Sequence, residues 1–139
     1  MNMHRTYSEA PLKIKIIMVG DSGVGKTNIK DRFCRGTFAV LSNSTIGVEY
    51  AGRKFWAPWG GKKERFEINF WDVAGTSTEN VVSPLYFKNA MGVIYVYDIT
   101  KENSLESLSE WRKKVLDHAN CPKMTEVLIG NKSDLVNLR

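Results

Sequence analysis

Apolar residues in the first third of the chain form a strand-like run and then recur at helical spacing. Pro11 precedes a nearly continuous apolar run over residues 14–19, which predicts a buried strand. Ile29 and Phe33 lie four positions apart in the next segment, and Gly36 can end the helix that this spacing predicts. Residues 37–47 are rich in Ser, Thr and Asn without periodicity, so we expect a loop there.

The middle of the chain predicts a β-hairpin. Residues 48–56 have the composition of an extended segment, and residues 66–70 alternate apolar and polar side chains as a half-buried strand does. Asp72 ends this second strand. Residues 73–83 are again irregular, which predicts a second loop before a short helical piece near Tyr86.

The last third alternates strand, helix and strand. Residues 91–97 are almost all apolar, as in a strand that is covered on both faces of a parallel sheet. Asn103 or Ser104 can cap the helix that follows, with Glu106 placed for a capping-box contact to Asn103. Residues 127–129 predict another buried strand. The buried stripe of the helix would be Leu105, Leu108, Trp111 and Val115.

Strands that alternate with helices indicate an α/β fold with a doubly wound, mostly parallel sheet and one antiparallel strand. The 139 residues suffice for one core, and we expect a flexible tail at 1–10 and one domain at 11–139. No apolar run matches a membrane span or a signal peptide, which predicts a cytoplasmic protein with Cys34 and Cys121 as reduced thiols. The net charge of +5 implies at most weak attraction to anionic surfaces, and we expect no nucleic-acid partner.

The loop between the first strand and the first helix has the composition of a phosphate-binding site. Its glycines let successive backbone N–H groups and the positive end of a helix converge on phosphate oxygens. Lys26 would reach the β- and γ-phosphates, and the Thr27 hydroxyl would take one position around Mg²⁺. The segment is Gly20-Asp21-Ser22-Gly23-Val24-Gly25-Lys26-Thr27.

Two more polar motifs follow predicted strands. The Asp72 carboxylate can hold Mg²⁺ through water, and the Gly75 N–H can meet a γ-phosphate. Asp134, in the motif Asn131-Lys132-Ser133-Asp134, can accept hydrogen bonds from N1–H and the 2-amino group of guanine. Adenine has neither donor, so a site built this way discriminates by about 10⁴ or more. An adenine-nucleotide enzyme is therefore disfavoured.

With these three motifs in this order, the chain resembles the small GTPases of the Ras superfamily over residues 13–134. Three segments look most like the Rab branch, namely Ser44-Thr45-Ile46-Gly47-Val48-Glu49-Tyr50, Trp71-Asp72-Val73-Ala74-Gly75 and residues 86–98. The resemblance implies a P-loop NTPase fold and a molecular switch that binds GTP or GDP with Mg²⁺.

The resemblance also implies roles for single residues. Thr45 would close on Mg²⁺ and the γ-phosphate in the GTP state, and Phe38 would pack edge-on against guanine; an ordinary loop Thr and a core Phe are the alternatives. Asn131 would contact the base, and the stem of Lys132 would cover it. Mg²⁺ would be held by Thr27, Thr45 and Asp72, and hydrolysis would involve Lys26, Thr45, Gly75 and Thr76. The expected nucleotide-binding residues are Asp21, Ser22, Gly23, Val24, Gly25, Lys26, Thr27, Asn28, Phe38, Thr45, Gly75, Asn131, Lys132 and Asp134.

Partner contacts are expected around the nucleotide. The resemblance implies that an exchange factor, a GTPase-activating protein and effectors use residues 37–50, Trp71 and residues 73–87. Strand alternation independently places Trp71 on the polar face of its strand, where an exposed Trp can anchor an interface. Tyr86 and Phe87 are candidates for the same patch. The alternative is a Trp packed under a neighbouring loop.

Position 76 departs from the family pattern. Gln usually follows the Asp-x-x-Gly motif and orients the attacking water, whereas this chain has Thr76. A hydroxyl on one carbon is too short for that task, so we expect hydrolysis slower than the roughly 10⁻⁴ s⁻¹ of an unassisted switch. Alternatively, Thr78, Glu79 or a partner supplies the missing contact.

The family normally continues beyond the last residues of this chain. A further strand, a guanine-contacting loop, a C-terminal helix and a prenylated Cys tail would follow. Without them we expect marginal stability, weaker nucleotide affinity and an exposed edge strand at residues 127–129. We favour the alternative that the 139 residues are a piece of a longer form. Membrane contact, at the cytoplasmic face of endomembranes, would then depend on a lipidated tail in that form.

An apparent insertion, residues 57–64, separates the two hairpin strands. From Arg53 to Arg65 there are five basic residues and one acidic residue, so this hairpin carries +4 of net charge. Trp56 and Trp59 flank the insertion. Basic charge interleaved with Trp could hold a partner's acidic face or anionic lipid head groups. A solvated hairpin with a covered Trp is the alternative.

These observations predict a guanine-nucleotide switch, Rab-like in vesicle trafficking, with weak intrinsic GTP hydrolysis. The alternative is a non-hydrolysing pseudo-GTPase or an interaction scaffold. Thr76 and the missing final elements motivate that alternative.

Overall fold

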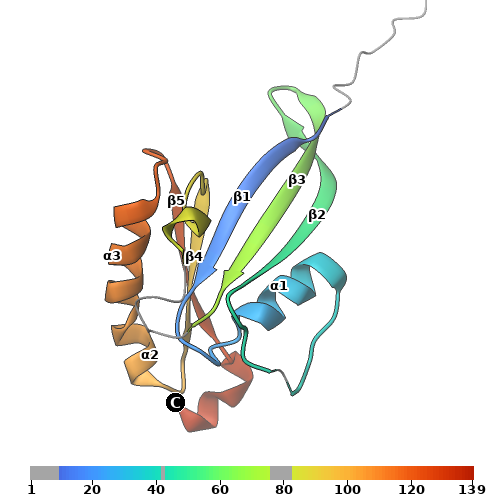
Figure 1. The fold of residues 1–139 in the computed structure, drawn as a ribbon. Helices are drawn as coiled ribbons and strands as arrows, with labels where there is room; N and C mark the ends of the chain where they lie inside the picture. Colours follow the sequence, from blue (N-terminus) through green and yellow to red (C-terminus); the bar gives the residue numbers. More distant parts are fainter. Residues whose placement is uncertain (1–9, 42, 76–82) are drawn as a thin grey trace, which may run out of the picture.

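A five-stranded sheet runs through the computed structural model, which describes residues 10–41, 43–75 and 83–139. The strand order is β2-β3-β1-β4-β5, and only the β2–β3 pair is antiparallel. α1 lies against one face of the sheet and α3 against the other (Figure 1). The expected α/β, mostly parallel fold is thereby confirmed. The elements are β1 (Leu12–Val19), α1 (Lys26–Arg35), β2 (Val48–Trp59), β3 (Lys62–Val73), the 3₁₀ helix η1 (Pro84–Tyr86), β4 (Gly92–Asp98), α2 (Glu102–Glu106), α3 (Leu108–His118), β5 (Thr125–Asn131) and the 3₁₀ helix η2 (Ser133–Leu138).

Two apolar clusters hold the helices to the sheet. On one face, Ile17 of β1 packs with Trp111 and Val115 of α3, all at most 4% exposed. On the other face, Met18 of β1 packs in a cluster that Ile29 of α1 joins. Burying one such side chain stabilises the fold by about 1.5–3 kcal/mol. Because adjacent β1 residues point to opposite faces, this one strand belongs to both clusters.

The first helix follows the predicted pattern. α1 ends at Arg35 and is capped by Gly36, whose φ of 71° is left-handed and whose N–H returns to the carbonyls of the last turn. Phe33 of α1 meets Phe70 of β3 edge to face, with ring centroids 5.2 Å apart. The helix therefore docks on β3 and places the preceding loop at the carboxyl end of β1.

The hairpin differs from the prediction, because residues 57–64 are no insertion into a loop. The β2–β3 ladder continues to the pair Trp59 and Lys62, and only Gly60 and Gly61 form the turn. Both glycines have positive φ, 57° and 79°, as two-residue turns of hairpins require. The hairpin tip extends beyond the helices at the end of the sheet opposite η2 (Figure 1).

Strand register divides the positive charge of this hairpin between its two faces. Paired residues share a face, so the pairs Trp56 with Arg65 and Pro58 with Lys63 lie together. Arg53, Trp59 and Lys62 lie on the opposite face, where Lys62 pairs with Glu64 at 2.6 Å. The charges that the sequence places in one segment therefore do not form one patch.

The helical segment after β4 corrects three predictions. Leu105, expected in the buried stripe, is 44% exposed, whereas Leu108, Trp111 and Val115 are buried. α2 begins after Lys101, which makes no side-chain cap, so neither Asn103 nor Ser104 caps the helix. The Ser104 hydroxyl instead donates to the Lys101 carbonyl and accepts from the Asp98 N–H, at 2.6 and 3.0 Å. The single expected helix is also divided at Ser107.

The last strand, β5, lies at the edge of the sheet. Val127 and Leu128 are 45% and 59% exposed, so the expected exposed edge is confirmed and the expectation of a buried strand is wrong. No element covers their outer side in the part of the chain that the structure describes. Arg112 of α3 holds β5 by two hydrogen bonds to Glu126, at 2.8 and 3.0 Å. This hydrogen-bonded pairing lowers the pKa of Glu126.

Candidate functional site

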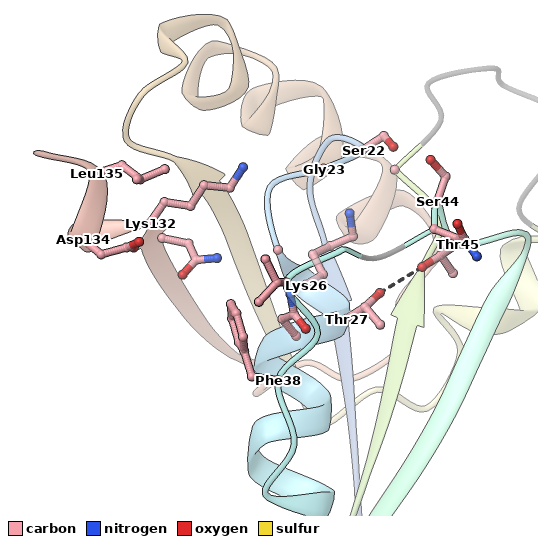
Figure 2. Close-up of a pocket in the computed structure, with 16 residues that line it drawn as sticks. Ser22, Gly23, Lys26, Thr27, Phe38, Ser44, Thr45, Lys132, Asp134 and Leu135 are labelled. Carbon is pink, nitrogen blue, oxygen red and sulfur yellow. Dashed lines mark hydrogen bonds between the residues drawn. The ribbon is translucent and has the colours of Figure 1, made fainter. Parts of the chain in front are cut away.

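A cleft of about 600 Å³ opens at the carboxyl ends of β1, β3 and β5, beside the start of α1 (Figure 2). Open α/β sheets bind their ligands at such ends. Twelve of the predicted residues line it: Ser22, Gly23, Gly25, Lys26, Thr27, Asn28, Phe38, Thr45, Gly75, Asn131, Lys132 and Asp134. Sequence reasoning missed four more as site residues: Val40, Asn43, Ser44 and Leu135.

The loop between β1 and α1 places a buried lysine at the floor of the cleft. Lys26 is 5% exposed, and its Nζ donates to the carbonyls of Gly20 and Asp21 at 2.8 Å each. Burial lowers the pKa of Lys26, while the carboxylates of Asp72 and Asp21 raise it. The backbone carbonyls thus hold the ammonium inside the loop, where an anion in the cleft would meet it.

A glycine is required where this loop meets β5. Gly25 has φ 102°, and a Cβ added there would collide with Nδ2 of Asn131. That same nitrogen donates to the Val24 carbonyl at 2.8 Å. The contact joins the phosphate-loop segment to the predicted base-reading motif, although the two are more than a hundred residues apart in sequence.

Three oxygen-bearing side chains converge beside Lys26. The Thr27 and Thr45 hydroxyls are 2.9 Å apart (Figure 2), and the Thr27 hydroxyl also donates to Oδ2 of Asp72. These residues come from α1, the following loop and β3. Hydroxyl and carboxylate oxygens are the ligands that Mg²⁺ prefers. The structure therefore brings together the three residues expected to hold the metal.

The Asp72 carboxylate can bind a cation in addition to the partners that it has in the structure. It is fully buried, and its Oδ1 has no hydrogen-bond partner among the described residues. Burial raises the pKa of Asp72, against the hydrogen bond from Thr27 and the charges of Lys26 and Lys30. An unpartnered buried carboxylate oxygen is costly, and a cation or its bound water would satisfy it. The donor set at this position fits Mg²⁺.

Gly75 lies directly against the phosphate-loop segment. Its carbonyl accepts the Ser22 N–H at 3.1 Å, and a Cβ at position 75 would collide with the backbone of Asp21 and Ser22. Only glycine permits this approach. The start of the second predicted loop is thereby held at the cleft. Thr76 lies outside the described residues.

The opposite end of the cleft is built by the segment after β5. Lys132 has a left-handed backbone with φ 67°, and its Nζ pairs with Oδ2 of Asp98 at 2.7 Å. Burial would raise the pKa of Asp98, but hydrogen bonds from Lys132 and Thr100 outweigh it and lower the pKa. Asp134 is exposed and lines the cleft. The motif therefore presents the Asp134 carboxylate to the cleft, with no hydrogen-bond partner among the described residues, and uses Lys132 to fix the turn.

Phe38 faces the same cleft from the segment after α1 (Figure 2). It is 66% exposed, which disfavours the alternative of a core phenylalanine. Asn28 holds this segment by two hydrogen bonds with the Ala39 backbone, at 3.0 Å each. The Asn28 side chain therefore positions the segment that carries Phe38.

Two predicted residues contribute no side chain to the lining. The Asp21 carboxylate turns towards α3, where it accepts from the Ser107 hydroxyl at 2.5 Å and from the Trp111 indole at 3.0 Å. Val24 is buried and offers its carbonyl to Asn131. Both side chains support the loop from behind.

Trp71 is only half-buried, as its strand alternation predicts, and it packs among aromatic and basic side chains. Its ring lies 5.4 Å from Tyr50 and 6.0 Å from Tyr86, and the Lys15 Nζ sits 4.5 Å from its centroid. Phe87, in contrast, is 3% exposed and belongs to the core, so its place in this patch was predicted wrongly. The aromatic surface consists of Tyr50, Trp71 and Tyr86.

The sequence offered a signal for three of the four missed lining residues. Asn43 and Ser44 lie in the polar loop next to Thr45, and Leu135 directly follows Asp134, so each could have been included by proximity. Val40 is an exposed apolar residue in a segment without periodicity, and nothing in the sequence marks it. Its position follows only from the path of the loop.

Comparison with known proteins agrees with this fold and site. The sequence profile of the Ras family matches residues 15–139 of this chain, so the chain belongs to the Ras family. It is 42% identical to the Ras-related protein RABA2a of Arabidopsis thaliana over 135 residues, 97% of this chain and 60% of the relative. It is 40% identical to the Ras-related proteins YPTC6 of Chlamydomonas reinhardtii and Rab11C of Lotus japonicus over 136 residues, 98% of this chain and 61% of each relative. The chain is thus a Rab-like small GTPase by family, and it spans about 60% of the length of these relatives.

Proposed function

We propose that this domain is a guanine-nucleotide switch that binds GTP and GDP together with Mg²⁺. The observation that carries the proposal is that Lys26, Thr27, Thr45 and Asp134 line one cleft, with the buried Asp72 carboxylate hydrogen-bonded to Thr27. Lys26 would bind the β- and γ-phosphates, and Asp134 would accept the two donors of guanine. Mg²⁺ held by the Thr27–Thr45–Asp72 group would neutralise phosphate charge.

The switching part of the proposal depends on the two loops that meet the metal site. Thr45 comes from the loop before β2, and Gly75 begins the loop after β3. Contacts that both residues make with a γ-phosphate would be lost when it leaves, and the loops would relax. Effectors and regulators would then distinguish the two states through residues 37–50, the aromatic surface and residues 73–87.

We further propose that intrinsic GTP hydrolysis is weak, because Thr76 stands where a residue long enough to orient water is needed. The same residue supports a second candidate, a pseudo-GTPase or scaffold that binds nucleotide without hydrolysing it or binds no nucleotide. By analogy with its Rab-named relatives, the protein would act in vesicle trafficking at the cytoplasmic face of endomembranes. In the described part of the chain, no helix has both the length and the apolar character to cross a membrane.

One experiment separates the two candidates. Nucleotide is extracted from the purified protein and identified, and the loss of bound GTP is then followed with Mg²⁺. Bound guanine nucleotide with slow conversion to GDP is expected. GTP that persists unchanged would favour the pseudo-GTPase. Absence of nucleotide would contradict nucleotide binding by either candidate. As a base-specificity test, Asp134→Asn should weaken GDP binding by about 10² or more, while the neighbouring Ser133→Ala should not.

A further inference from the structure

A second buried lysine lies one helical turn beyond Lys26 on α1. Lys30 is 1% exposed, and the phosphate-binding pattern assigns it no role. Lysine is almost never fully buried unless its charge is paired, because moving an ammonium out of water is costly. The surroundings of Lys30 should therefore explain why a charge lies here.

Carboxylates on three elements surround the Lys30 ammonium. Its Nζ lies 2.7 Å from Oε2 of Glu49 on β2, 3.7 Å from Oδ2 of Asp72 on β3 and 3.7 Å from Oδ1 of Asp31 on α1. The Glu49 side chain is 50% exposed, whereas Asp72 is fully buried. Lys30 is thus a fixed cation that joins the helix to the strands that follow Thr45 and precede Gly75.

The carboxylate near Lys30 is the same one that faces the candidate metal site. Oδ2 of Asp72 accepts from the Thr27 hydroxyl and lies near the Lys30 ammonium. A positive charge within about 4 Å stabilises the ionised carboxylate and repels a second cation that approaches it. Lys30 therefore supplies, without any metal, part of the neutralisation that Mg²⁺ would supply to Asp72.

We propose that Lys30 weakens the dependence of nucleotide retention on Mg²⁺. The inference rests on the function proposed above. When Mg²⁺ is removed, the charge of Lys30 still compensates the Asp72 carboxylate, so its repulsion of the bound phosphates is weaker. When Mg²⁺ is present, the same charge repels it, and Mg²⁺ is bound less tightly. Lys30 is accordingly a positioning residue that acts through Asp72, and Glu49 anchors its ammonium.

The test is the release of a fluorescent GDP analogue in excess MgCl₂ and in EDTA. The measured quantity is the ratio of the release rates in EDTA and in MgCl₂. For Lys30→Met, which removes the charge and keeps the chain length, the ratio should be about tenfold larger than in the wild type, and half-maximal protection should need about tenfold less Mg²⁺. Lys113→Met removes a charge from the exposed side of α3 and should leave the ratio unchanged.

A second readout does not depend on release kinetics. The GDP-bound Lys30→Met protein should melt at a lower temperature than the wild type in EDTA and recover most of the difference when Mg²⁺ is added. Lys30→Gln, which can still donate a hydrogen bond to Glu49, is measured beside it. If the Met variant does not fold, the Gln variant still tests the loss of the charge. Equal release ratios in the wild type and in the folded neutral variants would overturn this inference alone. Absence of guanine nucleotide from every protein, the wild type included, would overturn the proposed function and this inference with it.

Discussion

Single residues in the cleft do not all act through direct contact with a ligand. Lys26, Thr27 and Thr45 line the cleft, whereas the Asn28 side chain holds the Ala39 backbone and the Asp21 carboxylate accepts hydrogen bonds from the Ser107 and Trp111 side chains. The division follows from geometry, because the hydrogen bonds of Asn28 and Asp21 direct these side chains towards the Ala39 backbone and towards α3. Substitutions at these two groups of residues should therefore differ in their effects.

Thr76 is the residue at which a single substitution should most change activity. Thr76→Gln supplies a carboxamide long enough to orient water, so single-turnover GTP hydrolysis should rise by about tenfold or more. The wild type should stay below roughly 10⁻⁴ s⁻¹ at the same Mg²⁺ concentration. Ser109→Gln, at an exposed position of α3 outside the cleft, serves as the matched control. An unchanged rate in Thr76→Gln would mean that Thr78, Glu79 or a partner supplies the contact instead.

At the scale of elements, the long hairpin is where charges that are neighbours in sequence lie on different faces in the structure. Its register brings Lys54, Lys63 and Arg65 to the same face as Trp56, and the pairing of β1 with β3 adds Lys13 to that face. We call these five residues the basic face. Glu67 is the acidic residue that shares it, 4.0 Å from Lys54. A flat face with excess positive charge and a half-exposed Trp fits anionic lipid head groups.

The basic face should therefore matter more for lipid binding than the opposite face of the hairpin, which carries Arg53 and the Lys62–Glu64 pair. A Lys63→Gln and Arg65→Gln double variant should bind phosphatidylserine vesicles about tenfold more weakly than the wild type in a sedimentation assay at low salt. The matched control is the Arg53→Gln and Lys62→Gln double variant, which removes the same charge from the other face. Equal losses of vesicle binding in both variants would mean that net charge alone causes the binding. No loss in either variant would exclude lipid as the partner.

At the scale of the whole molecule, the β5 edge of the sheet has apolar side chains that no described residue covers. Val127 and Leu128 of β5 border a hollow of about 370 Å³ that reaches to Leu105 and Leu108. The lining residues of this hollow are distinct from those of the cleft at the carboxyl ends of the strands. Exposed edge strands with apolar side chains promote association between chains.

The 139-residue chain should consequently associate at high protein concentration through this edge. Leu128→Lys places a charge on the exposed side of β5 and should shift the sedimentation profile towards the monomer, while GDP release stays as in the wild type. Lys123→Glu, which changes charge just before the strand, controls for a general effect on solubility. Identical profiles for Leu128→Lys and the wild type would show that β5 does not mediate association.

Much of this arrangement could be predicted from the sequence because its causes are local. Apolar spacing determines where β1, α1, β3 and β4 run, and the order of the phosphate, Asp-x-x-Gly and Asn-Lys-x-Asp motifs predicts which strand ends carry chemistry. Twelve of the predicted nucleotide-site residues accordingly line one cleft. The motifs also predict glycine at positions 25 and 75, although the contacts that require glycine there are long-range.

Only the tertiary structure decided which side chains face the cleft and which support it. Asp21 turns to α3, and Phe87 enters the core, because partners about 30 to 90 residues away in sequence are there to receive them. The two-residue turn at Gly60 and Gly61 settled the register that divides the hairpin's charge. Lys30 shows the same limit: a lysine on a helix gives no local sign that β2 and β3 will enclose its ammonium with carboxylates. Periodicity determines an element and its buried face, but the pairing of charges depends on which elements the fold brings together.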